Sequence, residues 1–553
     1  MFEEFRKLSY CLAGVAAMST ASLAVAQNAE LAPTESLITI TANGNAEALV
    51  ATLNPRAAAL KGALEAAGPN GELLMPFYEA NGYQAIWSQS GREALLDVLA
   101  AATDHGLPDT LYDLPALRQA ILTPGTPFEQ TEVAASLTLL DYARDVGTGI
   151  LEPRKVDRDI VIKRPELDVL ATLKGLSDSA NVGEYLTALA PNHKHYRTLL
   201  TEKQRLETLI MTGGWGEDVP AGATLKPGAK STRVTALRIR LERMESKAYG
   251  DSDVYDEELV EAVKGFQLRH GLNDDGVVGP ATLVAINAGP EDRLKQVLVN
   301  LERQRWLNLE RGTRHVYVNL ADFSVALIDD GNATFWSRTV IGKNKHRTQE
   351  FNDTMTHMVI NPTWNVPRSI ATEEMLPKLK RNPGSLGGSM QVMTRSGTSV
   401  NPKYVDFSQF NEKNFPFIVK QKPGGGNALG RVKFMFPNQF NIYLHDTPSK
   451  SLFNRDVRAY SHGCVRVQKP FDFAYALLAP QSDNPEGVFK SYLNKGTERQ
   501  VNLTTPVPVY LTYQSAWVGD DGVPQYRSDV YGRDKRMFDA LASAGVTLPT
   551  VDG

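Results

Sequence analysis

IYLHDTPSKSLFNRDVRAYSHGCVRV, residues 442–467, contains Cys464, one of only two cysteines in the 553-residue chain. Free cysteines are usually small buried apolar residues, but the Ser-His-Gly and Val-Arg neighbours make an apolar burial awkward here. A cysteine attacks a carbonyl as its thiolate, so its pKa of about 8.5 must be lowered by a cation, an imidazole or a helix N-terminus. His445, His462 and Arg466 lie near Cys464 in the sequence, and a helix is expected soon after it. The stretch therefore predicts a nucleophilic cysteine.

Gly463 allows the backbone to turn tightly beside this cysteine, where consecutive N–H groups can hold an oxyanion. Metal binding is the alternative use of one cysteine and two histidines. Structural zinc sites usually employ several cysteines at short spacing, and the chain has no such pattern. The sequence therefore predicts covalent chemistry with no metal and no cofactor.

Segments in which apolar residues occur at every second position surround this stretch. HVYVNL and SVALID flank Ala-Asp-Phe and predict a hairpin, and THMVINPTWNV, RVKFMF, NIYLHD and PVPVYLTYQSAWV add strands. A mainly-β catalytic domain is expected over residues 312–515, with the helix KPFDFAYALLA after Cys464 and a C-terminal tail over 516–553. Residues 368–426 form a Gly/Pro-rich insertion too long for an ordinary loop, which favours a lid.

Helical spacing dominates the earlier half of the chain. Segments such as GREALLDVLAAATDHGL predict a helical scaffold domain over residues 65–225. Three short helices follow over residues 230–290, the last starting with Pro280 at its first position. The predicted fold class is therefore multidomain α+β: a helical scaffold, a small three-helix module and a mainly-β domain with a long insertion.

The N-terminus has the features of an export signal. An apolar, small-residue stretch precedes Ala-Val-Ala at residues 24–26, which predicts a signal peptide over 1–26 that contains Cys11. The mature chain then has a single thiol. An odd cysteine in an exported protein indicates either intermolecular pairing or a reactive group.

Composition excludes several classes of protein. About 150 residues per domain predicts three or four domains, and 42% hydrophobic residues is ordinary for a globular protein. A formal net charge of −4 provides no basic field for nucleic acid and no polybasic membrane anchor. Partners must therefore be inferred from sites.

Two sets of motifs resemble known families. AVKGFQLRHGL followed by DGVVGPATL is similar to the peptidoglycan-binding type 1 domain, although a helical spacer without a ligand remains the alternative. His445, then fifteen residues, then Ser-His-Gly-Cys resembles the motif of L,D-transpeptidases with a YkuD-type catalytic domain. The likeness to the large periplasmic members extends over most of the chain. One departure is HRTQEF at 346–351, where many relatives have Thr-Pro, and we expect it to have no catalytic consequence.

The resemblance implies roles for the motif residues. Cys464 would attack the carbonyl between a diamino acid and the terminal D-alanine of a tetrapeptide stem, forming a thioester that an amine then resolves. His445 would be the general base and acid, with His462 as the competing candidate. His462 and Gly463 would supply oxyanion N–H groups, with Ser461 supporting the turn. Arg466 would fix the segment through a salt bridge or attract the stem's carboxylates.

The resemblance also implies a periplasmic enzyme that forms 3-3 crosslinks between peptidoglycan stems and is a carbapenem target. The sequence does not choose this acceptor over water, a D-amino acid or an outer-membrane lipoprotein, nor does it identify other cell-wall synthesis partners or an oligomeric state. A non-catalytic wall-binding scaffold is the alternative of another class. The intact histidine and cysteine motif argues against it.

Overall fold

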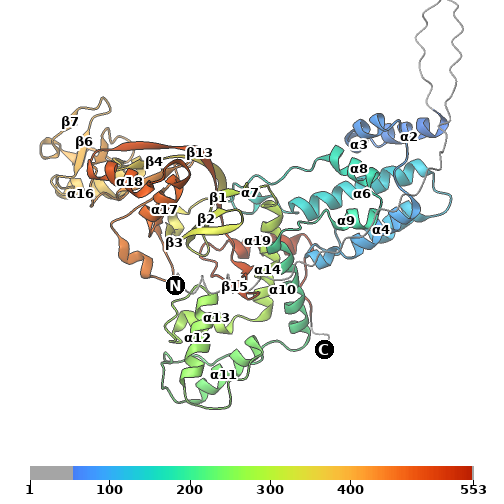
Figure 1. Cartoon of the computed structure of the whole chain (residues 1–553), viewed down its shortest axis with the longest axis horizontal. Helices are drawn as coiled ribbons and strands as arrows, with labels where there is room; N and C mark the ends of the chain where they lie inside the picture. The colour runs from blue at the N-terminus through green and yellow to red at the C-terminus, as the bar shows by residue number, and fades with distance from the viewer. Residues whose placement is uncertain (1–53, 551–553) are drawn as a thin grey trace, which may run out of the picture. The chain divides into compact units, whose positions relative to one another are not determined.

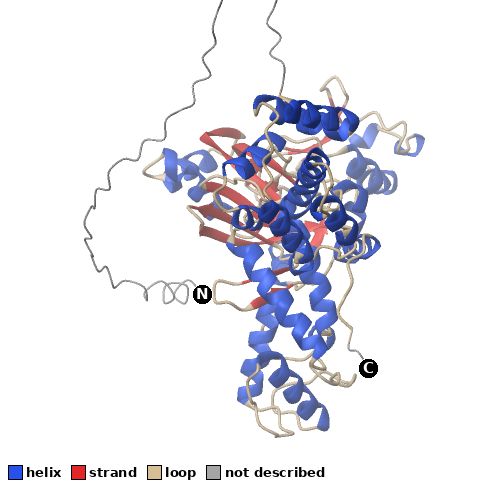
Figure 2. Ribbon diagram, turned by 90° about the vertical axis from the view of Figure 1, so that its right-hand side faces the viewer, coloured by secondary structure: helices blue, strands red, loops and turns tan. Residues whose placement is uncertain are grey.

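The computed structural model describes residues 54–550, which all belong to one compact unit spanning residues 53–553. The predicted signal peptide, residues 1–26, lies outside the described residues. None of the helices in the described part of the chain combines the length and the apolar character that a membrane span requires. Helices form most of this regular structure, and most of the strands belong to one large sheet (Figure 2).

The N-terminal region is a helical domain with one continuous apolar core. Apolar residues at helical spacing explain it: in the longest helix Leu139, Tyr142 and Val146 are all fully buried. The helices are α2 (Pro55–Ala66), α3 (Pro69–Ala80), α4 (Gln89–Ala100), α5 (Leu114–Leu122), α6 (Phe128–Thr148), α7 (Pro153–Val156), α8 (Val169–Asp178), α9 (Val182–Thr187) and α10 (Lys194–Met211).

The long helix α14 (Pro290–Trp306) packs in this same core, together with α19 (Arg533–Ser543) from the end of the chain. Two buried arginines of α14 are paired, Arg303 with Asp534 at 2.7 Å and Arg305 with Glu302 at 2.9 Å, and this pairing offsets the cost of burying a charge. Residues 516–553 are expected as a tail, but the described part of this segment, to residue 550, forms β14 (Ala516–Val518), β15 (Pro524–Tyr526) and α19. Met537 of α19 is fully buried, so the described end of the chain is part of the fold.

The three-helix module consists of α11 (Thr232–Glu245), α12 (Glu257–Arg269) and α13 (Pro280–Asn287), which gather in Figure 1. Its core includes Val234, Leu237 and Val263, which are fully buried. The helix that ends at Arg269 is followed by Gly271 with φ +67°, a left-handed conformation that glycine adopts without strain.

The mainly-β domain is built on a sheet of nine strands in the order β11-β3-β12-β10-β9-β4-β13-β1-β2. Because β3 also pairs with β2, the sheet closes on itself as in a barrel. The strands are β1 (Arg314–Asn319), β2 (Ser324–Asp329), β3 (Asn332–Gly342), β4 (Phe351–Ile360), β9 (Val432–Met435), β10 (Leu444–His445), β11 (Ala459–Ser461), β12 (Val465–Val467) and β13 (Arg499–Thr512). The helices α17 (Pro470–Leu478) and α18 (Pro485–Asn494) complete the domain.

The insertion is a folded subdomain with an apolar cluster of its own, which includes the fully buried Leu379 and Val419. A four-stranded sheet in the order β5-β8-β6-β7 forms one part of it. Its elements are β5 (Trp364–Asn365), α15 (Arg368–Ile370), a π-helical turn (Ala371–Met375), α16 (Leu376–Arg381), β6 (Met390–Met393), β7 (Ser399–Val400) and β8 (Ile418–Gln421). The predicted fold class is confirmed: a helical scaffold, a three-helix module and a mainly-β domain with a long insertion.

Candidate active site

Strand register places the candidate site residues on one face of the sheet. The parallel strands β10 and β12 pair Leu444 with Val465 and His445 with Arg466. Since side chains alternate between faces along a strand, Leu444 and Val465 enter the apolar core, where both are fully buried. His445, Cys464 and Arg466 therefore lie on the opposite face, and all three line one cavity of about 790 Å³.

The thiol of Cys464 is protonated at neutral pH in this structure. Burial raises its pKa to about 11, although hydrogen bonds from Tyr443 and the charges of Arg466 and Lys433 oppose this rise. Sγ donates to the carbonyl oxygen of Asn441 at 3.5 Å. We expected a neighbouring cation or imidazole to depress this pKa; the neighbours are present, but desolvation of the thiolate outweighs them.

His445 is a neutral imidazole. Its Nδ1 donates to the backbone carbonyl of Asp446 at 2.5 Å. In a neutral ring protonated at Nδ1, Nε2 is the proton acceptor. Burial lowers the pKa of His445 to about 3, and the nearby Arg466 guanidinium lowers it further. Backbone hydrogen bonds to Asp446 and Leu429 both raise this pKa and so oppose the shift. Asp446 is itself held by Lys450 at 2.7 Å.

A network of hydrogen bonds fixes the turn that precedes Cys464. Ser461 Oγ donates to the Cys464 carbonyl at 2.5 Å and accepts from the Gly463 N–H at 3.1 Å. Gly463 has φ +117°, a conformation that side chains rarely adopt. Its N–H is thus engaged within the turn and does not fit the expected oxyanion role. Among described residues, the N–H groups of His462 and Cys464 have no partner and are the better candidates.

His462 points to the insertion. Its Nε2 lies 2.6 Å from Glu374 Oε1 on the π-helical turn, and its ring lies 4.9 Å from that of His346. Lys343 is 3.9 Å from the same carboxylate. A histidine engaged in this way is less available as a base than His445.

Arg466 has no ion-pair partner in the described part of the chain, and its Nε is buried without a hydrogen bond. Burial lowers the pKa of its guanidinium. The structural salt bridge that we held open is therefore not formed among residues 54–550. An unpaired guanidinium at the cavity wall favours attraction of an anion instead.

Two residues at the site were not identified from the sequence. Tyr443 lies on the same strand face as His445, with ring centroids 5.7 Å apart, and it lines the cavity. The period-two pattern of IYLH contained the signal for Tyr443. Thr348 lies in the departing HRTQEF loop, and its hydroxyl donates to the Gly463 carbonyl at 2.7 Å. The structure thus places this loop against the turn that precedes the candidate nucleophile, a contact that argues against our expectation of no catalytic consequence.

No group of three or more metal-ligating side chains occurs within residues 54–550. The cavity is instead rich in cations, since Lys433 and Arg368 line it together with Arg466. Residues of the insertion, including Ile370 and Glu374, line its other side. The arrangement can hold an anionic substrate against a thiol and a neutral imidazole.

Comparisons with known proteins agree with this geometry. Residues 72–202 match a family model of a scaffold domain, residues 230–286 a peptidoglycan-binding domain, and residues 313–509 the YkuD L,D-transpeptidase catalytic domain. A 223-residue segment is 32% identical to a Haemophilus influenzae protein named as an L,D-transpeptidase, covering 40% of this chain and 45% of that protein.

A second curated relative, an N-acetylmuramoyl-L-alanine amidase of Bacillus licheniformis, is 41% identical over 69 residues, covering 12% of this chain and 19% of that protein. The matches span less than half the length of either curated relative. A solved L,D-transpeptidase from Mycobacterium smegmatis shares 12% identity over 36% of this chain and 58% of its own, with a TM-score of 0.18, too low to support an inference.

Proposed function

We propose that this chain, which carries a YkuD-type L,D-transpeptidase catalytic domain and a peptidoglycan-binding domain, crosslinks peptidoglycan stems by cysteine acyl transfer. The observation that carries the proposal is the strand register that puts Cys464, His445 and Arg466 on one cavity-lining face. A nucleophile, a proton acceptor and an anion-binding group are the parts that acyl transfer from an acidic peptide needs.

In the first step Sγ of Cys464 attacks the carbonyl carbon between the diamino acid and the terminal D-alanine, while Nε2 of His445 takes the thiol proton. The N–H groups of His462 and Cys464 hold the oxyanion. When the C–N bond breaks, His445 returns the proton to the departing D-alanine amine and a thioester remains. In the second step an amine of another stem attacks the thioester, a C–N bond forms, the C–S bond breaks, and the amine's proton restores the thiol.

The Cys464 thiol and the His445 imidazole are both neutral before substrate binds, and this limits when the proton can move between them. With a thiol pKa of about 11 and an imidazole pKa of about 3, a resting thiolate–imidazolium pair is unfavourable. In the proposed mechanism the proton moves as the substrate binds and the C–S bond forms. A substrate that displaces water from the cavity and places its carboxylates near Arg466 supplies counter-charge for the imidazolium that develops.

The acceptor defines the finer activity. We propose formation of 3-3 crosslinks by the amine of a second stem; the same acyl-enzyme also permits hydrolysis, D-amino-acid exchange, or attachment and release of an outer-membrane lipoprotein. The insertion, residues 368–426, acts as a lid held by the Glu374–His462 contact. The peptidoglycan-binding module supports a periplasmic site of action at the cell wall.

The test is incubation of the full chain with tetrapeptide-containing muropeptides, followed by mass spectrometry. Wild-type protein is expected to release D-alanine and form crosslinked dimers, whereas Cys464→Ala forms neither. His445→Ala is expected to lose acylation by a carbapenem while keeping the thiol. Dimer formation by Cys464→Ala would refute the nucleophile, and absence of any acylation of wild-type protein would favour a non-catalytic wall-binding scaffold.

A further inference from the structure

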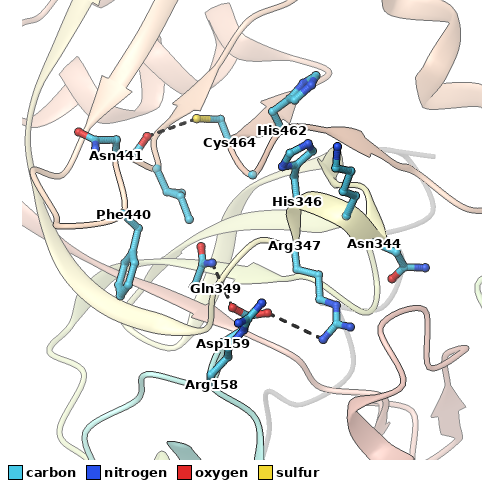
Figure 3. A pocket seen from close by; sticks show the side chains of 13 residues that line it. Arg158, Asp159, Asn344, His346, Arg347, Gln349, Phe440, Asn441, His462 and Cys464 are labelled. Carbon is cyan, nitrogen blue, oxygen red and sulfur yellow. Dashed lines mark hydrogen bonds and ion pairs between the residues drawn. The ribbon is translucent and has the colours of Figure 1, made fainter. Parts of the chain in front are cut away.

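A second cavity reaches Cys464 from the side of the scaffold domain (Figure 3). It has a volume of about 430 Å³ and is lined at one end by Cys464 and Asn441 and at the other by Arg158 and Asp159, with Arg347 in the wall. Cys464 also lines the larger cavity that contains His445. The candidate nucleophile thus lies where two cavities meet.

The second cavity is cationic. Arg158, Lys345 and Arg347 line it against the single carboxylate of Asp159. Arg347 is committed to the scaffold, because its guanidinium lies 3.4 Å from Asp157 and 3.8 Å from Asp159. Arg158 is exposed and has no ion-pair or hydrogen-bond partner among the described residues. Its charge is available to a ligand.

The scaffold segment that presents Arg158 is firmly attached to the catalytic domain. Glu350 N donates to the Asp159 carbonyl at 2.9 Å, and Val161 N donates to the Glu350 carbonyl at 2.7 Å. Asp159 also accepts from Gln349 at 3.3 Å, as the dashed line in Figure 3 shows. This backbone pairing, at Asp159 and Val161, holds the chain immediately after Arg158 against the loop that lines the cavity.

Acyl transfer brings two peptide stems to one thiol, and each stem carries carboxylates. The larger cavity offers the unpaired Arg466 for one of them. The second cavity offers the unpaired Arg158 at the end that is remote from the thiol. Each cavity that opens on Cys464 therefore contains one uncommitted guanidinium, the group best suited to bidentate recognition of a carboxylate.

We propose that the cavity between the scaffold segment 157–159 and the loop 344–349 is a binding site for a carboxylate of a peptidoglycan stem, with Arg158 as its anion-binding residue. This inference rests on the proposed function and extends it, because it makes the scaffold domain part of the substrate site. The carboxylate belongs either to the donor stem or to the acceptor, and the two half-reactions distinguish them.

The experiment compares Arg158→Gln with Arg154→Gln in the full chain. Arg154 is an exposed arginine of α7 that does not line the cavity. Two reactions are measured separately: acylation by a tetrapeptide donor without acceptor, and transfer to a second stem. Each is measured with stems whose carboxylates are free and with stems whose carboxylates are amidated. Loss of a charge-assisted hydrogen bond is expected to raise KM for free stems in one half-reaction roughly 10-fold, with kcat unchanged and no effect on amidated stems.

A loss confined to acylation assigns the carboxylate to the donor, and a loss confined to transfer assigns it to the acceptor. The inference would be overturned if Arg158→Gln had the same KM values as Arg154→Gln. It would also be overturned if Arg158→Gln raised KM equally for free and for amidated stems. Binding of a stem to Cys464→Ala protein, measured by calorimetry with and without Arg158→Gln, needs no turnover. If Arg158→Gln weakens stem binding 10-fold, the site is supported even when wild-type protein fails to acylate, because that failure would refute only the proposed function. Unchanged stem binding overturns the site.

Discussion

Replacing Thr348 with valine removes one buried hydroxyl and leaves the side-chain volume nearly unchanged. That hydroxyl donates to the Gly463 carbonyl at 2.7 Å and accepts from the Gly342 N–H at 2.9 Å. Thr348 is fully buried, so neither backbone group regains a partner from water. Each unpaired buried group costs about 1–3 kcal/mol. Because the turn can relax, we expect the free energy of unfolding to fall by roughly 2–3 kcal/mol, the low end of the combined cost of the two unpaired groups.

The same substitution is expected to slow the chemistry, because relaxation of the turn moves the N–H groups of His462 and Cys464 off the oxyanion. Loss of one aligned donor costs about 10²–10³ in rate, so a partial displacement is expected to cost about 10–100-fold in the acylation rate. KM for the donor stem should change little, since Arg466 is untouched. A rate effect without a KM effect separates positioning of the turn from simple instability.

The assay follows acylation of Cys464 by intact-protein mass spectrometry at a temperature well below the melting point of the variant. Thr348→Ser is the matched control: it keeps the hydroxyl and removes one methyl group, worth about 1 kcal/mol of buried apolar surface, so its acylation rate should remain near that of wild type. If Thr348→Val acylates at the wild-type rate while losing stability, the residue is structural only and the reasoning fails.

Three further outcomes follow from the geometry. Alkylation of Cys464 by iodoacetamide should accelerate about tenfold per pH unit between pH 7 and 10, because the thiolate fraction rises with pH below a pKa of about 11; a plateau near pH 7 would contradict a protonated resting thiol. Gly463→Ala should slow acylation about tenfold through strain at φ +117°, whereas Gly388→Ala, in open space without a positive φ, should have no effect; equal rates in the two variants would exclude strain. Glu374→Gln should weaken the contact with His462 and speed proteolysis within the insertion while the melting temperature stays constant, since exposed pairs contribute little; unchanged cleavage would count against a lid.

Local sequence patterns predicted much of the fold because they record which face of each element is buried. The hairpin of HVYVNL and SVALID forms as β1 and β2, and the helix predicted to start at Pro280 forms as α13. The alternation in IYLH and CVRV likewise indicates that His445 lies on the polar face of its strand and that Cys464 and Arg466 lie on the polar face of theirs. What it did not contain was the pairing of β10 with β12, which brings the two faces together.

The supporting contacts could not be predicted, because they join segments far apart in the chain. Thr348 precedes Gly463 by more than a hundred residues, and Arg158 lies earlier still. Nothing in HRTQEF indicates that its threonine reaches a catalytic turn. The sign of the Cys464 pKa shift also depended on burial depth, which neighbouring cations in the sequence do not reveal.

The contacts that hold Thr348 and Gly342 beside the turn preceding Cys464 come from the C-terminal end of the chain. Tyr531 donates to the Gly342 carbonyl and accepts from Thr348 N, and Arg533 donates to the Thr348 carbonyl at 2.9 Å. Both residues follow Cys464 by more than sixty positions. A nascent chain that has already exposed its thiol therefore lacks the contacts that shape the oxyanion site. The turn beside the candidate nucleophile gains its full set of contacts only after Arg533 has been synthesised.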